Sequence, residues 1–227
     1  MNKFLNILLI IIHFPIILFC IIIGFNFPID FFNTSGDEIP YKFEIFISIA
    51  SFIGLIFLYR SVQRWIGIQM LNQKHRFQWN IEMDKSRVNQ VFLYLILESL
   101  VQVFIGIGLY QLTTYALPLS IVLFLFSLDH LVLAFLGKYG KKFRVGMTKK
   151  VLLAVDRDLK SIYFQGLSEV DIQQQSIFFD YINDLQLSIP SDAIPLNKRT
   201  EFFLTFEKLI NREKVYFSES FKSFSNS

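Results

Sequence analysis

Residues 91–112 read VFLYLILESLVQVFIGIGLYQL, and residues 115–137 read YALPLSIVLFLFSLDHLVLAFLG. The hydrocarbon core of a bilayer is roughly 30 Å thick, and a helix needs about 20 mostly apolar residues to cross it. Both stretches meet that length. Only Thr113 and Thr114 separate them, so we expect two membrane-spanning helices joined by a tight antiparallel turn.

Two further apolar runs precede this pair, at Phe4–Phe27 and Phe43–Tyr59. The first run is longer than the apolar core of a signal peptide, and no small-x-small cleavage site follows it. We therefore expect it to be retained. Together the four runs predict a membrane-embedded, all-α four-helix bundle over residues 1–137, in a chain whose residues are 53% hydrophobic.

The segments between the runs alternate in charge. The segment at 28–42 is mainly acidic, whereas the segments at 60–90 and 138–150 are rich in Lys and Arg. Basic loops stay on the cytoplasmic side of a membrane. This pattern predicts a multi-pass protein with both termini in the cytosol. Trp65 and Trp79 in the second segment are expected at the headgroup level, which favours amphipathic indole rings.

The chain changes character after residue 137. Apolar and polar residues alternate around Val145, Leu153 and Ile189, with the period of a β-strand. Between residues 202 and 210 the apolar spacing becomes that of one helix face. We expect an α+β domain over residues 138–217, built from antiparallel strands and one C-terminal helix, and a flexible Ser-rich tail over residues 218–227.

Two stretches of this region, MTKKVLL at 147–153 and IYFQGLSEV at 162–170, are followed by the late apolar helix. In that order they resemble the bacterial PH-like domains that are attached to membrane helices. The resemblance covers the C-terminal part of the chain only. It implies a PH-like fold and a location in the bacterial inner (cytoplasmic) membrane, and that family has no shared catalytic residue.

A few polar side chains interrupt the apolar runs. Ionisable groups inside a membrane span are costly and usually face protein or water. Glu98 lies seven residues after Val91, and His130 lies seven residues before Gly137, which places both about 10 Å from the cytoplasmic end of their helices. We therefore predict an intramembrane polar cluster. Its expected members are His13, Glu98, Gln102, Asp129 and His130.

Three interpretations of this cluster stay open. The first is an interhelical hydrogen bond that fixes helix register. The second is a proton or ion path, because histidine titrates near neutral pH and a carboxylate partner tunes it. The third is a metal site, for which His13, Glu98, Asp129 and His130 supply suitable ligand types. No local spacing motif supports the third, so whether a metal binds is left unknown.

The basic segment after the fourth run has two interpretations of its own. It either marks the cytosolic side or contacts anionic lipid headgroups, which attract juxtamembrane cations. The candidate lipid-contact residues are Lys138, Lys141, Lys142 and Arg144.

The sequence contains no Gly-rich phosphate loop, no H-E-x-x-H, no G-x-S-x-G and a single cysteine, Cys20. We expect no enzymatic activity and no cofactor. The net charge of +3 gives no reason to expect nucleic-acid binding. The leading hypothesis is a membrane scaffold or accessory protein. Its cytosolic domain contacts a protein partner or anionic lipid headgroups, and the expected partners are membrane lipid and either another protein or a second copy of the chain. The alternative is a proton- or ion-coupled transport subunit that uses Glu98 and His130.

Overall fold

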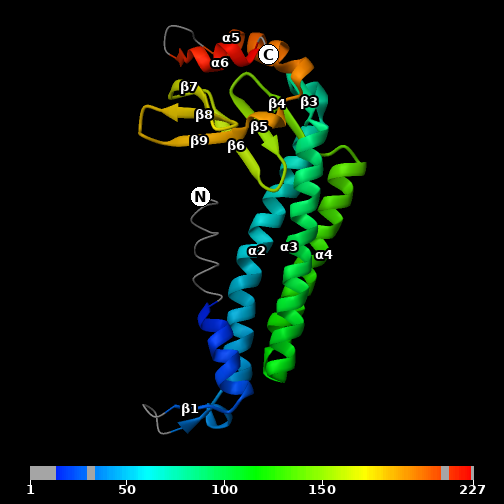
Figure 1. The fold of residues 1–227 in the computed structure, drawn as a ribbon, viewed down its shortest axis with the longest axis vertical. Helices are drawn as coiled ribbons and strands as arrows, with labels where there is room; N and C mark the ends of the chain where they lie inside the picture. Colours follow the sequence, from blue (N-terminus) through cyan, green and yellow to red (C-terminus); the bar gives the residue numbers. More distant parts are fainter. Residues whose placement is uncertain (1–13, 30–33, 211–214, 226–227) are drawn as a thin grey trace. The chain divides into compact units, whose positions relative to one another are not determined.

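The computed structural model describes residues 14–29, 34–210 and 215–225 (Figure 1). The chain divides into two compact units. The first contains the described parts of Met1–Leu58 together with Leu97–His130. The second contains Tyr59–Ile96 together with the described parts of Leu131–Ser227. Each unit is described by itself.

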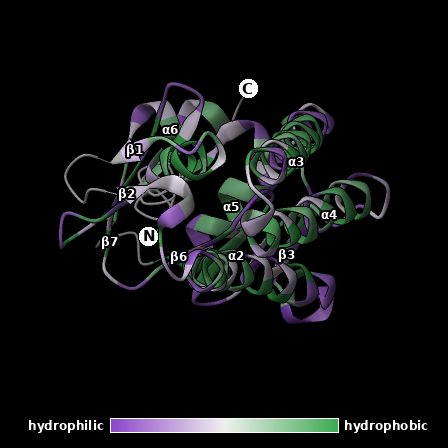
Figure 2. Cartoon of the chain, turned by 90° about the horizontal axis from the view of Figure 1, so that it is seen from below, coloured by the Kyte–Doolittle hydropathy of each residue, from purple (hydrophilic) through white to green (hydrophobic). Residues whose placement is uncertain are grey.

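Among the described residues, three helices are long and apolar enough to cross a membrane: α2 (Lys42–Asn72), α3 (Lys85–Leu112) and α4 (Leu117–Tyr139), which with the 3-10 turn before it spans Thr114–Tyr139. In the most apolar 18-residue stretch of each helix, only 22–39% is buried inside the protein. Figure 2 shows hydrophobic residues over much of these helices. Apolar side chains that point outward over such lengths are typical of lipid-facing helices.

The second, third and fourth apolar runs are thus confirmed as membrane-capable helices. The first run is described only in part. Its described portion includes a shorter apolar helix, Phe14–Gly24, and residues 1–13 lie outside the described residues. That the first run also crosses the membrane, and that the four helices form a bundle, stays a prediction.

The first unit has its own apolar core. Cys20, from the helix at Phe14–Gly24, and Phe46 of α2 are both fully buried in it. Phe57 of α2 stacks on Phe126 of α4 with ring centroids 4.8 Å apart. Strands β1 (Pro28–Ile29) and β2 (Thr34–Ser35) form a small antiparallel pair before α2 begins. The helices of this unit are therefore joined by dispersion contacts between apolar side chains.

The second unit contains two four-stranded sheets. The first sheet is fully antiparallel in the order β3-β4-β5-β6. Its strands are β3 (Trp79–Glu82), β4 (Arg144–Met147), β5 (Val151–Val155) and β6 (Leu159–Tyr163). Strands β4 and β5 are almost entirely buried, as expected for central strands packed on both faces.

The second sheet has the order β10-β7-β8-β9. Strands β7 (Leu167–Gln173), β8 (Ser176–Tyr181) and β9 (Gln186–Pro190) form an antiparallel meander. Strand β10 (Tyr216–Phe217) returns from the C-terminal region and pairs with β7 in parallel. The antiparallel strands expected after residue 137 are therefore present.

Strand β3 comes from outside the expected α+β domain. It lies in the segment between α2 and α3 and pairs with β4, with Trp79 opposite Met147 and Glu82 opposite Arg144. The α3–α4 hairpin is consequently inserted between two neighbouring strands. The headgroup position expected for Trp79 is wrong, because its side chain is 5% exposed and packs on Phe202 at 5.4 Å.

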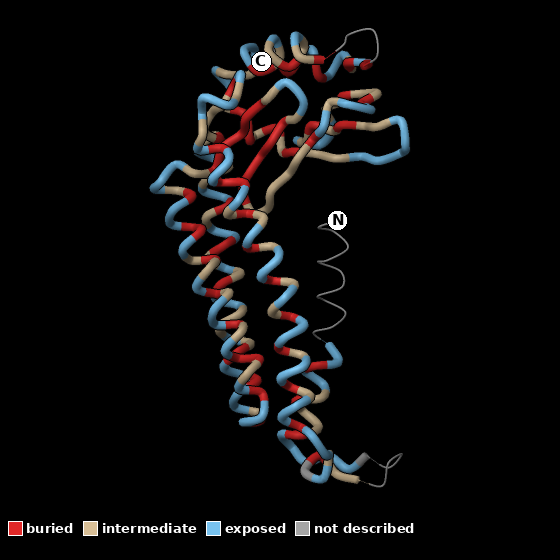
Figure 3. The backbone as a smooth tube through the Cα atoms, turned by 180° about the vertical axis from the view of Figure 1, so that it is seen from behind, coloured by how far each residue is buried: buried red, intermediate tan, exposed pale blue. Residues whose placement is uncertain are grey.

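Two helices, rather than the single one expected, follow the sheets: α5 (Arg199–Leu209) and α6 (Glu219–Ser225). Phe202 and Phe206 are buried on α5, which confirms the predicted apolar face. The region expected to be a flexible tail contains α6, whose Phe221 is fully buried. Figure 3 shows the buried backbone positions gathered in the strands and along these helices.

The carboxylate of Asp171 on β7 holds the C-terminal segment. Ser220 donates to Asp171 Oδ1 at 2.6 Å, and Ser218 N–H donates to the Val170 carbonyl at 3.1 Å. Hydrogen bonds from Ser218, Ser220 and Gln173 lower the pKa of Asp171 to about 2. Since the folded state favours the charged carboxylate, its stabilising effect is full above the ordinary pKa and is lost as the pH falls from about 4 to about 2.

We expect Asp171→Asn to loosen β10 and α6 at neutral pH, because the amide is a weaker acceptor than the carboxylate. Hydrogen exchange of residues 215–225 should be faster in this variant than in wild type. Protection relative to the intrinsic exchange rate at each pH should fall in wild type between pH 4 and pH 2, and the variant should lack this step. Asp184→Asn, in an exposed turn, is the control. Equal exchange in all three proteins would contradict the role of Asp171.

Candidate functional site

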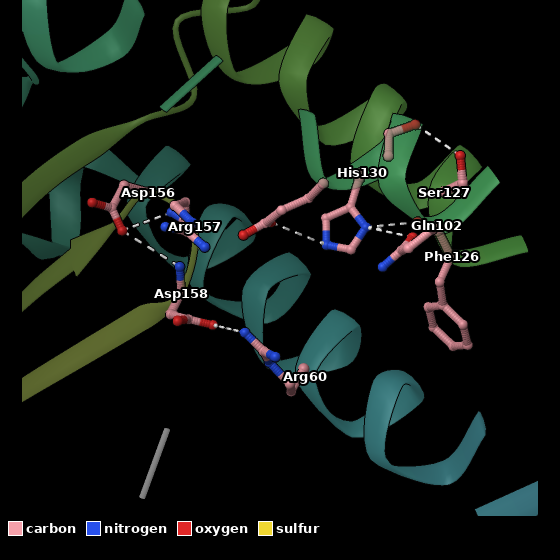
Figure 4. Close-up of polar contacts among 10 residues, drawn as sticks. Arg60, Gln102, Phe126, Ser127, His130, Asp156, Arg157 and Asp158 are labelled. Atoms are coloured by element: carbon pink, nitrogen blue, oxygen red, sulfur yellow. Dashed lines mark hydrogen bonds and ion pairs between the residues drawn. The ribbon is translucent and has the colours of Figure 1, made fainter. Parts of the chain in front are cut away.

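Polar side chains join α3 to α4 inside the first unit. On α3 these are Glu98, Ser99 and Gln102, and on α4 they are Ser127 and His130. The spacings of three and four residues place each set along one side of its helix. Figure 4 shows Gln102, Ser127 and His130 directed between the two helices.

His130 is buried and has acceptors on one side of its ring. Its Nδ1 lies 2.8 Å from the Phe126 carbonyl oxygen and 3.3 Å from Gln102 Oε1 (Figure 4). A carbonyl oxygen only accepts, so Nδ1 must carry a hydrogen and donate it. This contact fixes the position of the Nδ1 hydrogen, and the second nitrogen, Nε2, lies on the other side of the ring.

His130 Nε2 faces Glu98, with 3.8 Å between Nε2 and Glu98 Oε2. The contact predicted from the helical rise is therefore present. The His130 side chain is 8% exposed, whereas the Glu98 side chain is 36% exposed. At this distance the two groups are within reach of an ion pair but too far apart for a direct hydrogen bond.

Two purely structural hydrogen bonds flank this pair. Ser99 and Ser127 hydroxyls lie 2.7 Å apart across α3 and α4. Further along, the Ser120 hydroxyl donates to the Gly106 carbonyl at 2.8 Å. Small hydroxyl residues commonly join membrane helices in this way. The α3–α4 register is thus fixed at several levels, independently of the titratable pair.

The remaining members of the predicted polar cluster are placed as follows. His13 lies outside the described residues. Asp129 is partly exposed on α4, next to His130. In the part of the chain that the structure describes, no group of three or more His, Cys, Asp and Glu side chains is arranged to hold a metal ion. The metal hypothesis that included His13 stays a prediction.

A second polar arrangement lies in the second unit, where the β5–β6 turn is held by two arginines. Arg87 of α3 donates to Asp156 Oδ2 at 2.6 Å. Arg60 of α2 donates to Asp158 Oδ1 at 3.3 Å (Figure 4). Between them, the Arg157 guanidinium lies over the Tyr94 ring at 5.3 Å. The turn therefore contacts both helices through charged groups.

The Arg87–Asp156 pair is the more buried of the two. Its side chains are 16% and 6% exposed, compared with 19% and 21% for Arg60 and Asp158. Asp156 Oδ1 also accepts from the backbone N–H of Arg157 at 2.6 Å. Burial raises the pKa of nearby Asp192, while Arg87 lowers it. Both arginine partners of the turn are distant from it in the chain, and no local sequence pattern signals them.

The candidate lipid-contact residues have different surroundings. Lys138 lies over the Phe92 ring at 4.3 Å, and Lys142 donates to Asn72 Oδ1 at 3.2 Å. Lys141 is exposed and lies 3.9 Å from Glu82. Arg144 departs from the expectation. It is 5% exposed, donates to Asn80 Oδ1 at 2.7 Å and pairs with Glu82 at 3.3 Å, so its guanidinium is engaged inside the protein rather than available to lipid.

No family model, no curated protein and no solved structure matches this chain.

Proposed function

We propose that this chain is a multi-pass protein of the bacterial inner membrane that presents a PH-like domain in the cytosol as a non-enzymatic binding platform. The ligand is a protein partner or an anionic group such as a lipid headgroup. The antiparallel β3–β4–β5–β6 sheet and the antiparallel β7–β8–β9 meander, followed by α5, support the PH-like fold. The alternating loop charges support the cytosolic placement of both termini.

One observation carries the proposal. The core of the second unit includes buried residues from the ends of all three long helices as well as from both sheets. The helix contributions are Ile68 and Leu71 of α2, Val91 and Leu95 of α3, and Leu133 and Ala134 of α4. A domain on a flexible linker would have its own separate core. A shared core holds the sheets in a fixed orientation on the helix ends, which suits a platform that must face its ligand.

The surface of this unit also offers contact residues for a partner. Ile182 is 76% exposed and Leu185 is 52% exposed, both in the β8–β9 connection. Leu196, before α5, is 63% exposed. These exposed apolar side chains are positions at which a protein partner would be captured.

The proposal is tested in two measurements on the full chain. First, spin labels at Val62→Cys on α2 and Gln186→Cys on β9, with Cys20→Ser, should give one narrow distance distribution in liposomes. A broad distribution would overturn the rigid platform.

Second, a photo-crosslinking residue at Ile182 or Leu196 should give a discrete heavier adduct in native membranes. Phe104, 70% exposed on α3, is the control for lipid-facing positions. If neither Ile182 nor Leu196 of the second unit gives an adduct, the chain is not a binding platform for a protein.

The proximity of Glu98 and His130, 3.8 Å apart between α3 and α4, supports a second candidate, a proton- or ion-coupled transport subunit. Glu98→Gln and His130→Ala should each abolish a proton or ion flux measured in proteoliposomes, since either change removes one ionisable member of the pair. Ser127→Ala, which removes only the hydrogen bond to Ser99, is the matched control. Unchanged flux in the Glu98 and His130 variants would leave the pair with a structural role alone.

A further inference from the structure

The second unit contains a pocket of about 530 Å³ that is distinct from the Glu98–His130 pair and from the β5–β6 turn. It lies between the segment that leaves α2, the β4–β5 turn and the end of β6. Its lining residues are Arg76, Gln78, Thr148, Lys149, Lys150, Val151 and Tyr163. We refer to this set as the basic pocket.

Three of these side chains are cationic and face no carboxylate. Across residues 14–29, 34–210 and 215–225, Arg76, Lys149 and Lys150 form no ion pair within 4.0 Å. Other basic side chains of the same unit do have acidic partners: Arg60, Arg87, Lys141, Arg144, Lys198 and Lys222. Three uncompensated positive charges around one hollow attract a multiply charged anion.

The backbone that carries these cations is held in place. Thr148 Oγ1 accepts from the Lys150 and Val151 backbone N–H groups at 3.3 and 3.2 Å. The Lys150 carbonyl accepts from Phe164 N–H at 2.9 Å, and the Met147 carbonyl accepts from Gln78 N–H at 2.9 Å. The two walls of the pocket are therefore fixed to the β3–β4–β5 ladder, and a ligand would order only side chains. Such preorganisation lowers the entropic cost of binding.

The position of the basic pocket relative to α2 distinguishes between two sources of the anion, a lipid headgroup and a soluble ligand. Arg60 contacts the β5–β6 turn, whereas the pocket lies beyond Asn72, at the opposite end of β5. Asn72 lies twelve positions after Arg60 on α2, which corresponds to about 18 Å of helix length. If the hydrocarbon ends near Arg60, the first charged residue after the apolar run of α2, the headgroups of the same membrane do not reach the pocket.

We propose that the basic pocket binds the phosphate group of a soluble ligand, such as a phosphate monoester or diphosphate. Arginine and lysine suit phosphate oxygens. Gln78 and Thr148 add hydrogen-bonding groups, and the exposed Tyr163 ring with Val151 offers an apolar wall for an organic part of the ligand. This inference rests on the proposed platform function and names its ligand class and site.

The experiment measures binding of inorganic pyrophosphate to the full chain in neutral detergent, by thermal shift and calorimetry at constant ionic strength. We expect saturable binding, weakened about tenfold or more in Lys149→Gln/Lys150→Gln, because each charge-assisted hydrogen bond contributes strongly. Lys198→Gln/Lys208→Gln changes the net charge equally on the same unit and should bind like wild type. Equal weakening in both double variants, or no saturable binding, overturns the pocket.

A second arm uses liposome-reconstituted protein with neutral or anionic vesicles added from outside. A Lys149- and Lys150-dependent capture of anionic vesicles without any pyrophosphate binding would assign the pocket to lipid and overturn the soluble ligand. The results that reject phosphate binding at the basic pocket differ from those that reject the platform proposal. Crosslinks at Ile182 with no pyrophosphate binding reject the basic pocket alone, whereas a broad spin-label distribution rejects the platform.

Discussion

Asp156→Ala is expected to lower the free energy of unfolding of the full chain by about 3–5 kcal/mol, which is the usual effect of removing one member of a buried ion pair. The substitution leaves the Arg87 guanidinium buried beside Asp192 without its 2.6 Å partner. It also removes the acceptor of the Arg157 backbone N–H. Denaturant unfolding in a fixed detergent, followed by tryptophan fluorescence, measures the change.

Two comparisons make this result specific. Asp158→Asn on the same turn breaks the more exposed pair with Arg60 and should cost only up to about 1 kcal/mol. The double variant Arg87→Met/Asp156→Leu removes both buried charges and should be closer to wild type than Asp156→Ala is. If Asp156→Ala and Asp158→Asn have the same small effect, the β5–β6 turn is not held by a buried charge.

Phe206→Ala is expected to destabilise the second unit by about 3–5 kcal/mol, the range for truncating a buried phenylalanine. The Phe206 side chain is fully buried. Its ring lies within about 6 Å, centroid to centroid, of five other rings. Those rings belong to Phe164, Phe179, Phe202, Phe217 and Phe221. Because these rings come from the β6–β7 connection, β8, α5, β10 and α6, the cavity would weaken the packing of the C-terminal segment on the rest of the unit.

Leu204→Ala is the matched control, since Leu204 lies on the same helix and is 58% exposed. It should change stability by no more than about 0.5 kcal/mol. Unfolding in denaturant measures both variants, and hydrogen exchange locates the loss. Exchange should increase in β10 and α6 of Phe206→Ala first. A small effect that is equal in both variants would show that the aromatic cluster does not stabilise the unit.

The helices and most strands could be predicted from local sequence because their signals are local. Twenty apolar residues in a row specify a membrane-capable helix whatever surrounds them. The alternation around Val145 and Leu153 predicted strands that are now β4 and β5. The contact between Glu98 and His130 also followed from local rules, since a short turn and a fixed rise per residue match the depths of two antiparallel helices.

Other features had no local signal. Strand β3 is four residues long, too short for its alternation to stand out, and it forms because β4 offers it a partner. Arg60 and Arg87 looked like topology-marking cations, and only the folded chain brings them to Asp158 and Asp156. The Ser-rich C-terminal stretch has the composition of a flexible tail, but in the folded chain Phe221 packs on Phe203 and Phe206 of α5.

By itself, then, the sequence determined that the chain has long apolar helices followed by an antiparallel sheet region, because hydrophobic length and period are properties of neighbouring residues. Only the tertiary structure decided that an α3–α4 hairpin is inserted between β3 and β4, that Arg144 is buried, and that Arg76, Lys149 and Lys150 surround one pocket. Strand pairing, ion pairing and pockets depend on which distant segments meet, and that is set by packing of the whole core rather than by any local pattern.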